Sequence, residues 1–318
     1  MNRRRVLKIA AVAAAVPAGV FALRALQPGP RFFTWTGVAL GGEASLTLWH
    51  ADAGFAERTM ARMLAEVTRL EGVFSLFRSD SEISRLNAGG ALSGPSPDLV
   101  AVLDSAAEIS AASGGAFDVT VQPLWRLYQD HFRRPGADPA GPPAGDIAAA
   151  VAAIDFTAVQ TSARAVRLGR PGASVTLNGI AQGYITDRIA DLLRNEGFDH
   201  VVVELGETRV LGTRPDGRPW QIGIRDGTGS APNALALTDR ALAVSAGYGT
   251  VFETSGQSHH IFDPGTGRSP DGAITVAVAA DRATIADGLS TAIVVAGETR
   301  APALLAAYSG AQATIVRG

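Results

Sequence analysis

One long apolar stretch constrains the fold more than any other part of this sequence. Residues 274–280 read ITVAVAA, an apolar run rich in β-branched residues, which predicts a buried strand. Residues 286–297 read ADGLSTAIVVAG, in which most residues are small or apolar, and this predicts a buried helix. A buried strand that leads into a buried helix requires a large core, for which 318 residues with 47% hydrophobic content are ample.

The predicted helix nevertheless carries three side chains with oxygen atoms before its apolar run, Asp287, Ser290 and Thr291. Positions i and i+4 share one face of a helix, so Asp287 and Thr291 point the same way. One interpretation places Asp287 near the start of the helix, where its charge favours the helix dipole and caps free N–H groups. The other interpretation is a site for a hard metal cation, and the local pattern leaves both open.

The composition narrows the kinds of site that this chain can build. Its formal net charge is −2, so nothing suggests a nucleic-acid binder. It has no cysteine, which excludes disulfides, thiolate catalysis and thiolate metal sites. Of the five histidines only His259 and His260 are adjacent, and no spacing typical of a zinc site is present. Any metal is therefore expected to have oxygen ligands, which favours Mg²⁺ or Ca²⁺.

The N-terminal segment, residues 1–26, has the pattern of an export signal. Basic residues 3–5 precede an apolar run over residues 9–23, which is too short for a comfortable membrane span. The order RR-x-x-LK resembles a twin-arginine signal, with an ordinary secretory signal or an uncleaved inner-membrane anchor as alternatives. We therefore expect a periplasmic protein whose catalytic domain spans residues 31–318.

Periodicity and turn residues predict the remaining helices and strands. A β-hairpin is expected over residues 31–50, and the Pro- and Gly-rich segment 133–145 is expected to be a loop. Strict βαβ alternation is missing, so the predicted fold class is α+β, a single unit of mixed or antiparallel sheets flanked by helices. Helices are expected at 54–74, 97–112, 183–196 and 300–308, and strands at 200–204, 207–212, 220–225, as a pair within 234–253, and at the C-terminal end.

Residues 114–125, GGAFDVTVQPLW, form one segment that carries candidate chemistry. Two glycines end a helix, after which Asp118 and Thr120 are expected on one side of an extended segment, with Phe117 on the other. An ordinary helix-to-strand turn is the alternative.

Residues 176–187, TLNGIAQGYITD, form a second such segment. Gly179 and Gly183 allow the backbone to come close to a ligand, and a helix that starts near Gly183 would direct its N–H groups at an anion such as phosphate. The spacing matches neither a Walker loop nor GxGxxG, so the phosphate signal is weak by itself.

Residues 255–270, SGQSHHIFDPGTGRSP, form a third. Paired histidines beside Asp263 and a turn are suited to proton transfer or to phosphate contact. A hairpin with polar side chains in solvent explains the same residues equally well.

Seven blocks in consistent order, between about residue 35 and residue 318, resemble one family, the FAD:protein FMN transferases or ApbE-like flavin transferases. The blocks are SDSEISRLN, GGAFDVT, NGIAQGY-TD, LGETRVLG, SAGY, HIFDPGTG and ADGLSTA. The resemblance implies a T-fold-related α+β architecture and a specific reaction. Such enzymes cut the diphosphate of FAD and attach FMN through a phosphoester to a Thr or Ser of an acceptor protein, releasing AMP. They require Mg²⁺.

The resemblance also implies roles for individual residues. Asp287 and Thr291 match side-chain ligands of Mg²⁺, with the backbone carbonyls of Gly179 and Ser290 completing the set. Asp118 and His260 are the candidate catalytic residues, and the base that takes the acceptor's proton could be either of them or a metal-bound water. The positions that match FAD contacts are Leu40, Phe77, Ala116, Phe117, Asp118, Thr176, Gln182 and Ile261.

Four positions depart from the family pattern. Thr176 stands where many members have Asp, and Gln182 where many have Lys, so two charges are missing from the expected flavin pocket. Glu207 occupies a position where Gly is usual, and Leu40 one where Met is common. With the twin-arginine-like signal, these changes suggest an exported subgroup, some members of which flavinylate a membrane electron-transfer protein in nitrous-oxide reduction.

Three hypotheses about function follow. The first is an exported Mg²⁺-dependent flavin transferase that acts on an exported or membrane acceptor protein with a flavinylation-type Thr or Ser. The second is an FAD pyrophosphatase, in which water replaces the acceptor hydroxyl and the products are FMN and AMP. The third is a non-catalytic FAD-binding protein, which the missing charges at Thr176 and Gln182 keep open.

Overall fold

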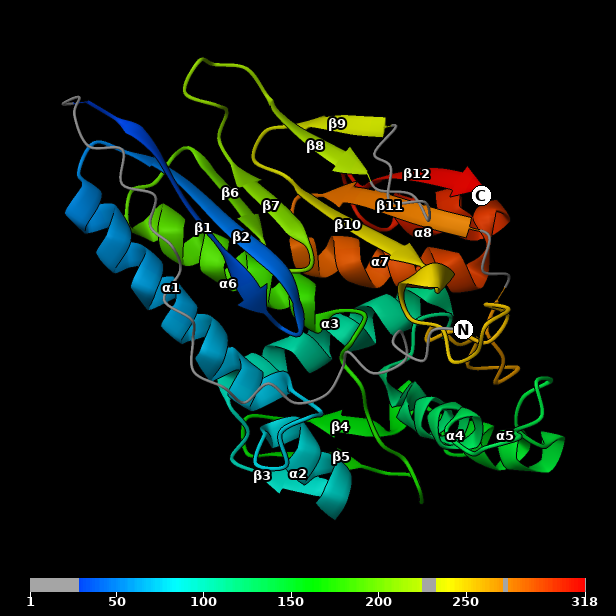
Figure 1. Cartoon of the computed structure of the whole chain (residues 1–318). Coiled ribbons are helices and arrows are strands. Elements are labelled where there is room, and N and C mark those ends of the chain that lie inside the picture. The colour runs from blue at the N-terminus through cyan, green and yellow to red at the C-terminus, as the bar shows by residue number, and fades with distance from the viewer. Residues whose placement is uncertain (1–28, 225–232, 271–273, 318) are drawn as a thin grey trace.

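The computed structural model describes residues 29–224, 233–270 and 274–317, and the predicted signal over residues 1–26 lies outside them. Within these residues the chain forms a large antiparallel sheet, two small sheets and surrounding helices, so the predicted α+β class is confirmed (Figure 1). In this part of the chain no helix is both long enough and apolar enough to cross a bilayer. The large sheet has the order β1 (Arg31–Ala39), β2 (Gly42–His50), β6 (Val201–Glu204), β7 (Thr208–Leu211), β10 (Ala241–Ala246), β11 (Ile274–Ala280) and β12 (Gln312–Arg317).

The apolar strand predicted from the sequence is β11, near one end of the large sheet. Val276 and Val278 face the main core, while Ala277 and Ala279 face a second cluster on the opposite side. Helix α7 (Ala283–Ala296) packs against β11, and the second cluster is completed by the two-stranded sheet of β8 (Trp220–Ile224) and β9 (Asn233–Leu237). Both faces of β11 are therefore covered, which explains why its sequence lacks polar alternation.

Helices α6 (Ala181–Asn195) and α7 lie side by side beneath the large sheet in Figure 1. Helix α1 (Ala53–Phe74) packs against α6, and α3 (Pro97–Ser113) against α7. A small sheet lies below them in the order β3 (Ala91–Ser93), β5 (Ala165–Leu168), β4 (Val159–Thr161), next to α2 (Glu82–Gly89). The remaining helices are α4 (Gln122–Phe132), α5 (Ala144–Val151) and α8 (Ala301–Ala306).

The start of α7 rejects the capping interpretation of Asp287. The helix begins at Ala283, so Asp287 lies in its second turn rather than at the cap. The cap comes from α6 instead, because Asp187 accepts hydrogen bonds from the backbone N–H groups of Ala283 and Thr284, both at 2.9 Å. The carboxylate of Asp287 therefore does not cap the N-terminus of α7.

Two local predictions were wrong. Residues 119–121 form a 3₁₀ turn rather than an extended segment, because Asp118 accepts a hydrogen bond from the N–H of Thr120 at 2.7 Å and caps the turn. The strands within 234–253 do not pair with each other, since β9 pairs with β8 and β10 lies between β7 and β11. The predicted loop 133–145 is confirmed except at its last two residues, because helix α5 begins at Ala144.

The predicted hairpin of β1 and β2 is confirmed, and its tip brings Leu40 into a left-handed conformation with φ of 55°. A bulky residue in this conformation is uncommon. The N–H of Leu40 donates to the Glu71 carboxylate at 2.8 Å, and its side chain packs against the main core. Both contacts hold the tip of the hairpin against α1.

Gly183 allows α6 and α7 to approach each other closely, and its replacement tests that contact. A Cβ atom at position 183 would overlap the carbonyl oxygen of Ala283. We expect Gly183→Ala to lower the free energy of unfolding by about 1–3 kcal/mol in urea titration, because the helices must separate. Gly72 in α1 is the matched control: a Cβ there meets nothing within 4 Å, so Gly72→Ala is expected to stabilise the protein by about 0.5–1 kcal/mol. Equal effects of the two changes would contradict this account of the helix contact.

Candidate active site

A cavity of about 210 Å³ opens where the first turn of α6, the middle of α7 and the end of β10 meet several connecting segments, chiefly those around residues 116–121, 176–179 and 260–262. Most of the residues predicted from the sequence to contact FAD, metal or acceptor line this cavity. They are Ala116, Phe117, Asp118, Thr176, Gly179, Gln182, His260, Ile261, Asp287 and Thr291. Segments that are more than 170 residues apart in the chain therefore converge on one site, as the family resemblance implies.

Three predicted residues do not line the cavity in this structure. Phe77 lies on the loop after α1 with 67% of its surface exposed, and Leu40 lies at the tip of the β1–β2 hairpin. Ser290 is fully buried, and its hydroxyl donates to the backbone carbonyl of Asp287 at 2.9 Å. The proposed contribution of Ser290 was its carbonyl group, so all three assignments stay predictions.

The carboxylate of Asp287 is buried beside the first turn of α6. It is only 3% exposed, and its Oδ2 accepts a hydrogen bond from the N–H of Gly183 at 3.0 Å. The N–H of Gly183, at the start of this helix, thus donates to a side chain of the protein, and the phosphate contact suggested by the sequence stays a prediction. Burial raises the pKa of Asp287 to about 7, opposed by the Gly183 hydrogen bond and reinforced by the negative charge of Asp187.

Thr291 lies one turn further along α7 and shares the face of Asp287, as the i, i+4 spacing predicted. The oxygens of Thr291 and Ser245 are 3.1 Å apart, which fixes the threonine side chain. Gly179 faces the same point, because a Cβ there would lie 3.0 Å from the Thr291 oxygen and 3.2 Å from the ring of Phe117. Glycine at 179 therefore lets the backbone approach Thr291 closely.

Asp118 is held in place by hydrogen bonds at the wall of the cavity. Its Oδ1 accepts from the N–H and the hydroxyl of Thr120, at 2.7 and 2.6 Å, and its Oδ2 accepts from the N–H of Phe156 at 3.1 Å. Burial still raises the pKa of Asp118 above its usual value, although these hydrogen bonds oppose the shift. This carboxylate is thus engaged in shaping the loop.

The two adjacent histidines have different environments. His259 is fully buried and joins the backbone of its own loop, through the Pro270 carbonyl at 2.9 Å and the N–H of Ile261 at 3.3 Å. His260 lines the cavity, and its Nδ1 lies 3.1 Å from the carbonyl oxygen of Thr250. A carbonyl can only accept, so Nδ1 carries the proton and Nε2 keeps a free lone pair. Burial lowers the pKa of His260 to about 4, so the ring is neutral at neutral pH.

The third member of the predicted polar cluster, Asp263, has a structural task. Its Oδ1 accepts from the N–H of Gly265 at 2.8 Å, and its Oδ2 from the hydroxyl of Thr266 at 3.0 Å. These bonds form the turn of the DPGTG segment. Of the proton-transfer candidates in 255–270, the structure brings only His260 into the cavity.

Several lining residues carried no role in the sequence analysis, among them Trp125, Ser245, Tyr248 and Glu207. Trp125 ends the quoted segment GGAFDVTVQPLW, and Ser245 and Tyr248 belong to the family block SAGY. Membership of these stretches was the only sequence feature that could have marked them as site residues. Glu207 was noted only as a departure from the family pattern. It is 8% exposed, and both burial and the nearby charge of Asp287 raise its pKa well above the usual value.

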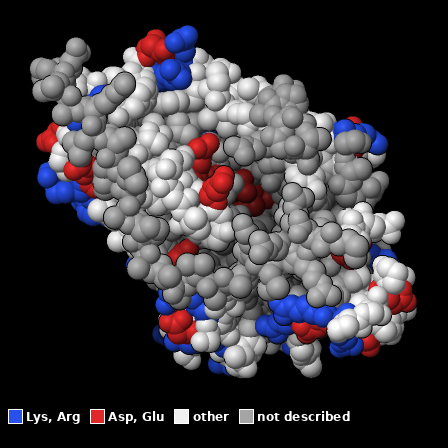
Figure 2. All heavy atoms as spheres, in the orientation of Figure 1, with Lys and Arg blue, Asp and Glu red and all other residues white. Residues whose placement is uncertain are grey.

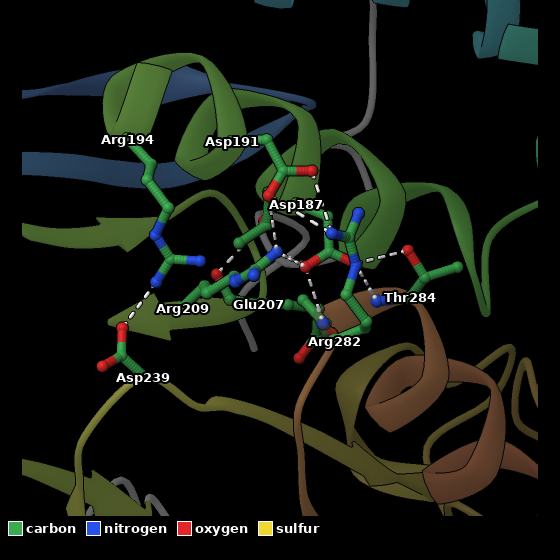
Figure 3. Close-up of polar contacts among 10 residues, drawn as sticks. Asp187, Asp191, Arg194, Glu207, Arg209, Asp239, Arg282 and Thr284 are labelled. Carbon is green, nitrogen blue, oxygen red and sulfur yellow. Dashed lines mark hydrogen bonds and ion pairs between the residues drawn. The ribbon is translucent and has the colours of Figure 1, made fainter. Parts of the chain in front are cut away.

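An ionic network that is buried at Asp187 and Arg209 and partly exposed at Asp191 and Arg282 joins α6, β7 and the start of α7. Figure 3 shows Asp187 at its centre, with Arg209 at 2.6 Å and Arg282 at 3.2 Å. Asp191 lies next to both arginines, 3.2 Å from Arg209 and 2.9 Å from Arg282. The hydroxyl of Thr284 also donates to Asp187, at 2.6 Å. The network fixes the relative positions of the two helices that hold Asp287 and Gly183.

This fold and site are those of a known family. A sequence profile of the ApbE family matches residues 40–315. The chain belongs to the ApbE family. It is 32% identical over 266 residues to an FAD:protein FMN transferase of Vibrio cholerae, covering 80% of this chain and 77% of that protein. It is 30% identical over 284 residues to the protein of the same name from Haemophilus influenzae, covering 83% and 82%.

Solved ApbE structures share the whole architecture. The apo flavinyl transferase ApbE of Pseudomonas stutzeri superimposes with a TM-score of 0.76 and 28% identity, covering 91% of this chain and 92% of that one. The ApbE protein of Thermotoga maritima gives a TM-score of 0.77 with 26% identity, covering 91% and 97%. The family resemblance and the fold class predicted from the sequence are both confirmed by these comparisons.

The donors around Asp287 suit the Mg²⁺ ion that was predicted for an ApbE protein. Within the described ranges no group of three or more His, Cys, Asp or Glu side chains could hold a metal, and no basic side chain pairs with Asp287 or Glu207. A carboxylate, a threonine hydroxyl and backbone carbonyls are hard oxygen donors of the kind that Mg²⁺ accepts while keeping some of its waters. Figure 2 shows acidic atoms among uncharged ones near the middle of the face seen in Figure 1. A cation at Asp287 would compensate buried negative charge.

The raised pKa of Asp287 predicts how stability depends on pH without divalent cations. The folded-state pKa of about 7 lies above the unfolded value of 3.8, so the unfolded chain loses this proton first as the pH rises. The contribution of Asp287 to the free energy of unfolding is therefore complete below about pH 4 and declines as the pH rises to 7. We expect Asp287→Asn, which cannot ionise, to exceed the unaltered chain in unfolding free energy by a few kcal/mol at pH 8 in EDTA, with the difference vanishing near pH 4. If the difference in unfolding free energy between Asp287→Asn and the unaltered chain does not vary with pH, the raised pKa of Asp287 is contradicted.

Proposed function

We propose that this chain is a Mg²⁺-dependent FAD:protein FMN transferase. It transfers the FMN part of FAD to a Thr or Ser hydroxyl of an acceptor protein, forms a phosphoester and releases AMP. The observation that carries this proposal is the convergence of Asp287, Thr291 and Gly179 with His260 in one cavity of an ApbE-family fold. Relatives named FAD:protein FMN transferase support it over most of the chain's length.

The metal would be held by the side chains of Asp287 and Thr291 and the carbonyls of Gly179 and Ser290. When bound, Mg²⁺ supplies positive charge that stabilises the phosphoryl oxygens and the departing AMP. The protein's own contribution is to keep these donors in place: Ser245 fixes Thr291, and the Gly183 N–H fixes Asp287. The site is therefore organised before substrates arrive.

His260 is the group best placed to accept the proton of the acceptor hydroxyl. Its Nδ1–H donates to the Thr250 carbonyl and so orients the ring, which leaves Nε2 as a proton acceptor. The hydroxyl oxygen forms its bond to the FMN phosphorus, the bond from this phosphorus to the AMP oxygen breaks, and the hydroxyl proton goes to Nε2. A bound diphosphate anion favours the resulting imidazolium, which burial alone disfavours. Asp118 would position the loop that contacts FAD.

The flavin pocket of this chain is proposed to lack two charges that many family members carry, at Thr176 and Gln182. Ala116, Phe117 and Ile261 provide apolar wall, and Thr176 and Gln182 provide polar groups without charge. Leu40 and Phe77 are proposed to contact FAD from the neighbouring hairpin tip and loop. Recognition then depends on stacking, shape and the metal rather than on charged side chains.

The reaction is proposed to take place in the periplasm. The twin-arginine-like segment, residues 1–26, supports export, with an uncleaved signal as a possible inner-membrane anchor. The acceptor would accordingly be an exported or membrane protein with a flavinylation-type Thr or Ser.

The test combines the chain with FAD, Mg²⁺ and an exported candidate acceptor, and records the intact mass of the acceptor together with AMP release. We expect a mass gain that corresponds to FMN. Asp287→Ala should reduce the transfer rate more than about 100-fold, because the metal loses its charged ligand. His260→Ala should reduce the rate by about 100-fold or more and leave FAD binding intact. Glu204→Gln, an exposed change on β6, is the matched control and should leave the rate unchanged.

Other outcomes decide between the alternatives. AMP and free FMN without modification of any acceptor offered would favour an FAD pyrophosphatase. Bound but unchanged FAD would favour a flavin-binding protein. A full rate in Asp287→Ala would contradict the metal assignment.

A further inference from the structure

Glu207 is a buried carboxylate in the cavity to which no role has yet been assigned. Glu207 is the last residue of the tight connection between β6 and β7. Its backbone carbonyl accepts a hydrogen bond from the N–H of Leu205 at 3.0 Å. Its side chain lines the cavity together with Asp287, and only 8% of the residue is exposed. A carboxylate buried to this extent needs compensation for the water it has lost.

Two contacts place Glu207 beside the proposed side-chain ligands. On one side its Oε2 accepts from the N–H of Val244 at 3.3 Å, and the next residue, Ser245, touches the Thr291 oxygen at 3.1 Å. On the other side its neighbour Gly206 lies against the amide group of Gln182. Gln182 precedes the Gly183 N–H that binds Asp287 at 3.0 Å. Glu207 is thus linked through Val244 to the residue that contacts Thr291, and through Gly206 to the residue before Gly183, and its carboxylate lies close enough to Asp287 to be affected by that charge.

The charge of Glu207 has no partner among the described residues. The nearest arginine along the chain, Arg209, directs its Nη1 to Asp187 at 2.6 Å and to Asp191 at 3.2 Å (Figure 3). One hydrogen bond, from Val244, reaches Oε2, and within the described part of the chain none reaches Oε1. Two carboxylates, Glu207 and Asp287, therefore share one buried cavity without a basic side chain.

We propose that the Glu207 carboxylate is an additional ligand of the divalent cation held by Asp287 and Thr291. The inference rests on the metal site of the proposed function and adds to it a second anionic ligand. A second negative charge raises the affinity of an oxygen site for a divalent cation. It would also leave fewer positions on the cation for water.

The competing explanation is that Glu207 only closes a turn by accepting the Val244 N–H. Glu207→Gln separates the two, because the amide oxygen still accepts that hydrogen bond while the charge is lost. The probe is Mn²⁺, and its binding to the full chain is followed by electron paramagnetic resonance and calorimetry without FAD. We expect Glu207→Gln to weaken Mn²⁺ binding at least about tenfold.

Thermal unfolding supplies a second readout. Without cations, Glu207→Gln should unfold at a higher temperature than the unaltered chain, because one of two repelling buried charges is gone. The rise in unfolding temperature produced by Mn²⁺ should be smaller in this variant. Glu204→Gln, which removes a nearby exposed carboxylate, is the control and should change neither quantity.

The outcomes separate this inference from the function on which it rests. Equal Mn²⁺ affinity in Glu207→Gln and the unaltered chain, with binding lost in Asp287→Asn, would overturn the role of Glu207 and keep the metal site. Undiminished binding in Asp287→Asn, or no binding to the unaltered chain at millimolar Mn²⁺, would overturn the metal site and the role of Glu207 together.

Discussion

The contacts of the buried Asp187 carboxylate are the interactions on which the rest of this structure depends. It closes the N-terminus of α7, pairs with Arg209 on β7 and projects from α6, so three elements of the core meet at one charge (Figure 3). Removing one partner of such a pair would leave an uncompensated charge in the interior, so the arrangement specifies one geometry. Because the cap comes from another helix, Asp287 in the second turn is not needed at the start of α7. Its Oδ2 accepts from the N–H of Gly183, and its side chain lines the cavity.

Buried negative charge without a basic partner is the chemical signature of the site. Asp287 and Glu207 share a cavity in which the described residues provide hydrogen bonds from Gly183 and Val244 but no positive side chain. Both residues are largely shielded from solvent, so ionising one carboxylate makes it less favourable to ionise the other until a proton or a cation neutralises the charge. A divalent cation meets this need, and an FAD diphosphate can then approach a region that would otherwise repel it.

The sequence predicted the fold best where burial alone dictates structure. The apolar strand was located to the residue, and the helix after it was predicted correctly in type but begins three residues earlier than expected, at Ala283. The i, i+4 pair Asp287 and Thr291 lies on the cavity face as expected. Prediction failed where the deciding partner is remote: β9 and β10 join different sheets through pairing that no local pattern encodes. The position of Glu207 in the cavity was missed for the same reason, because its neighbours in space come from β10, α6 and α7.

The most direct test of this account is the position of Mn²⁺ in crystals of the chain, located by its anomalous scattering. The account predicts one peak in the cavity, at roughly 2.1 Å from a carboxylate oxygen of Asp287 and from the Thr291 hydroxyl, with Glu207 as a further ligand. A peak held by other residues, or no peak at saturating Mn²⁺, would contradict it. The first result would establish that the charge buried between α6, β10 and α7 exists to hold a cation.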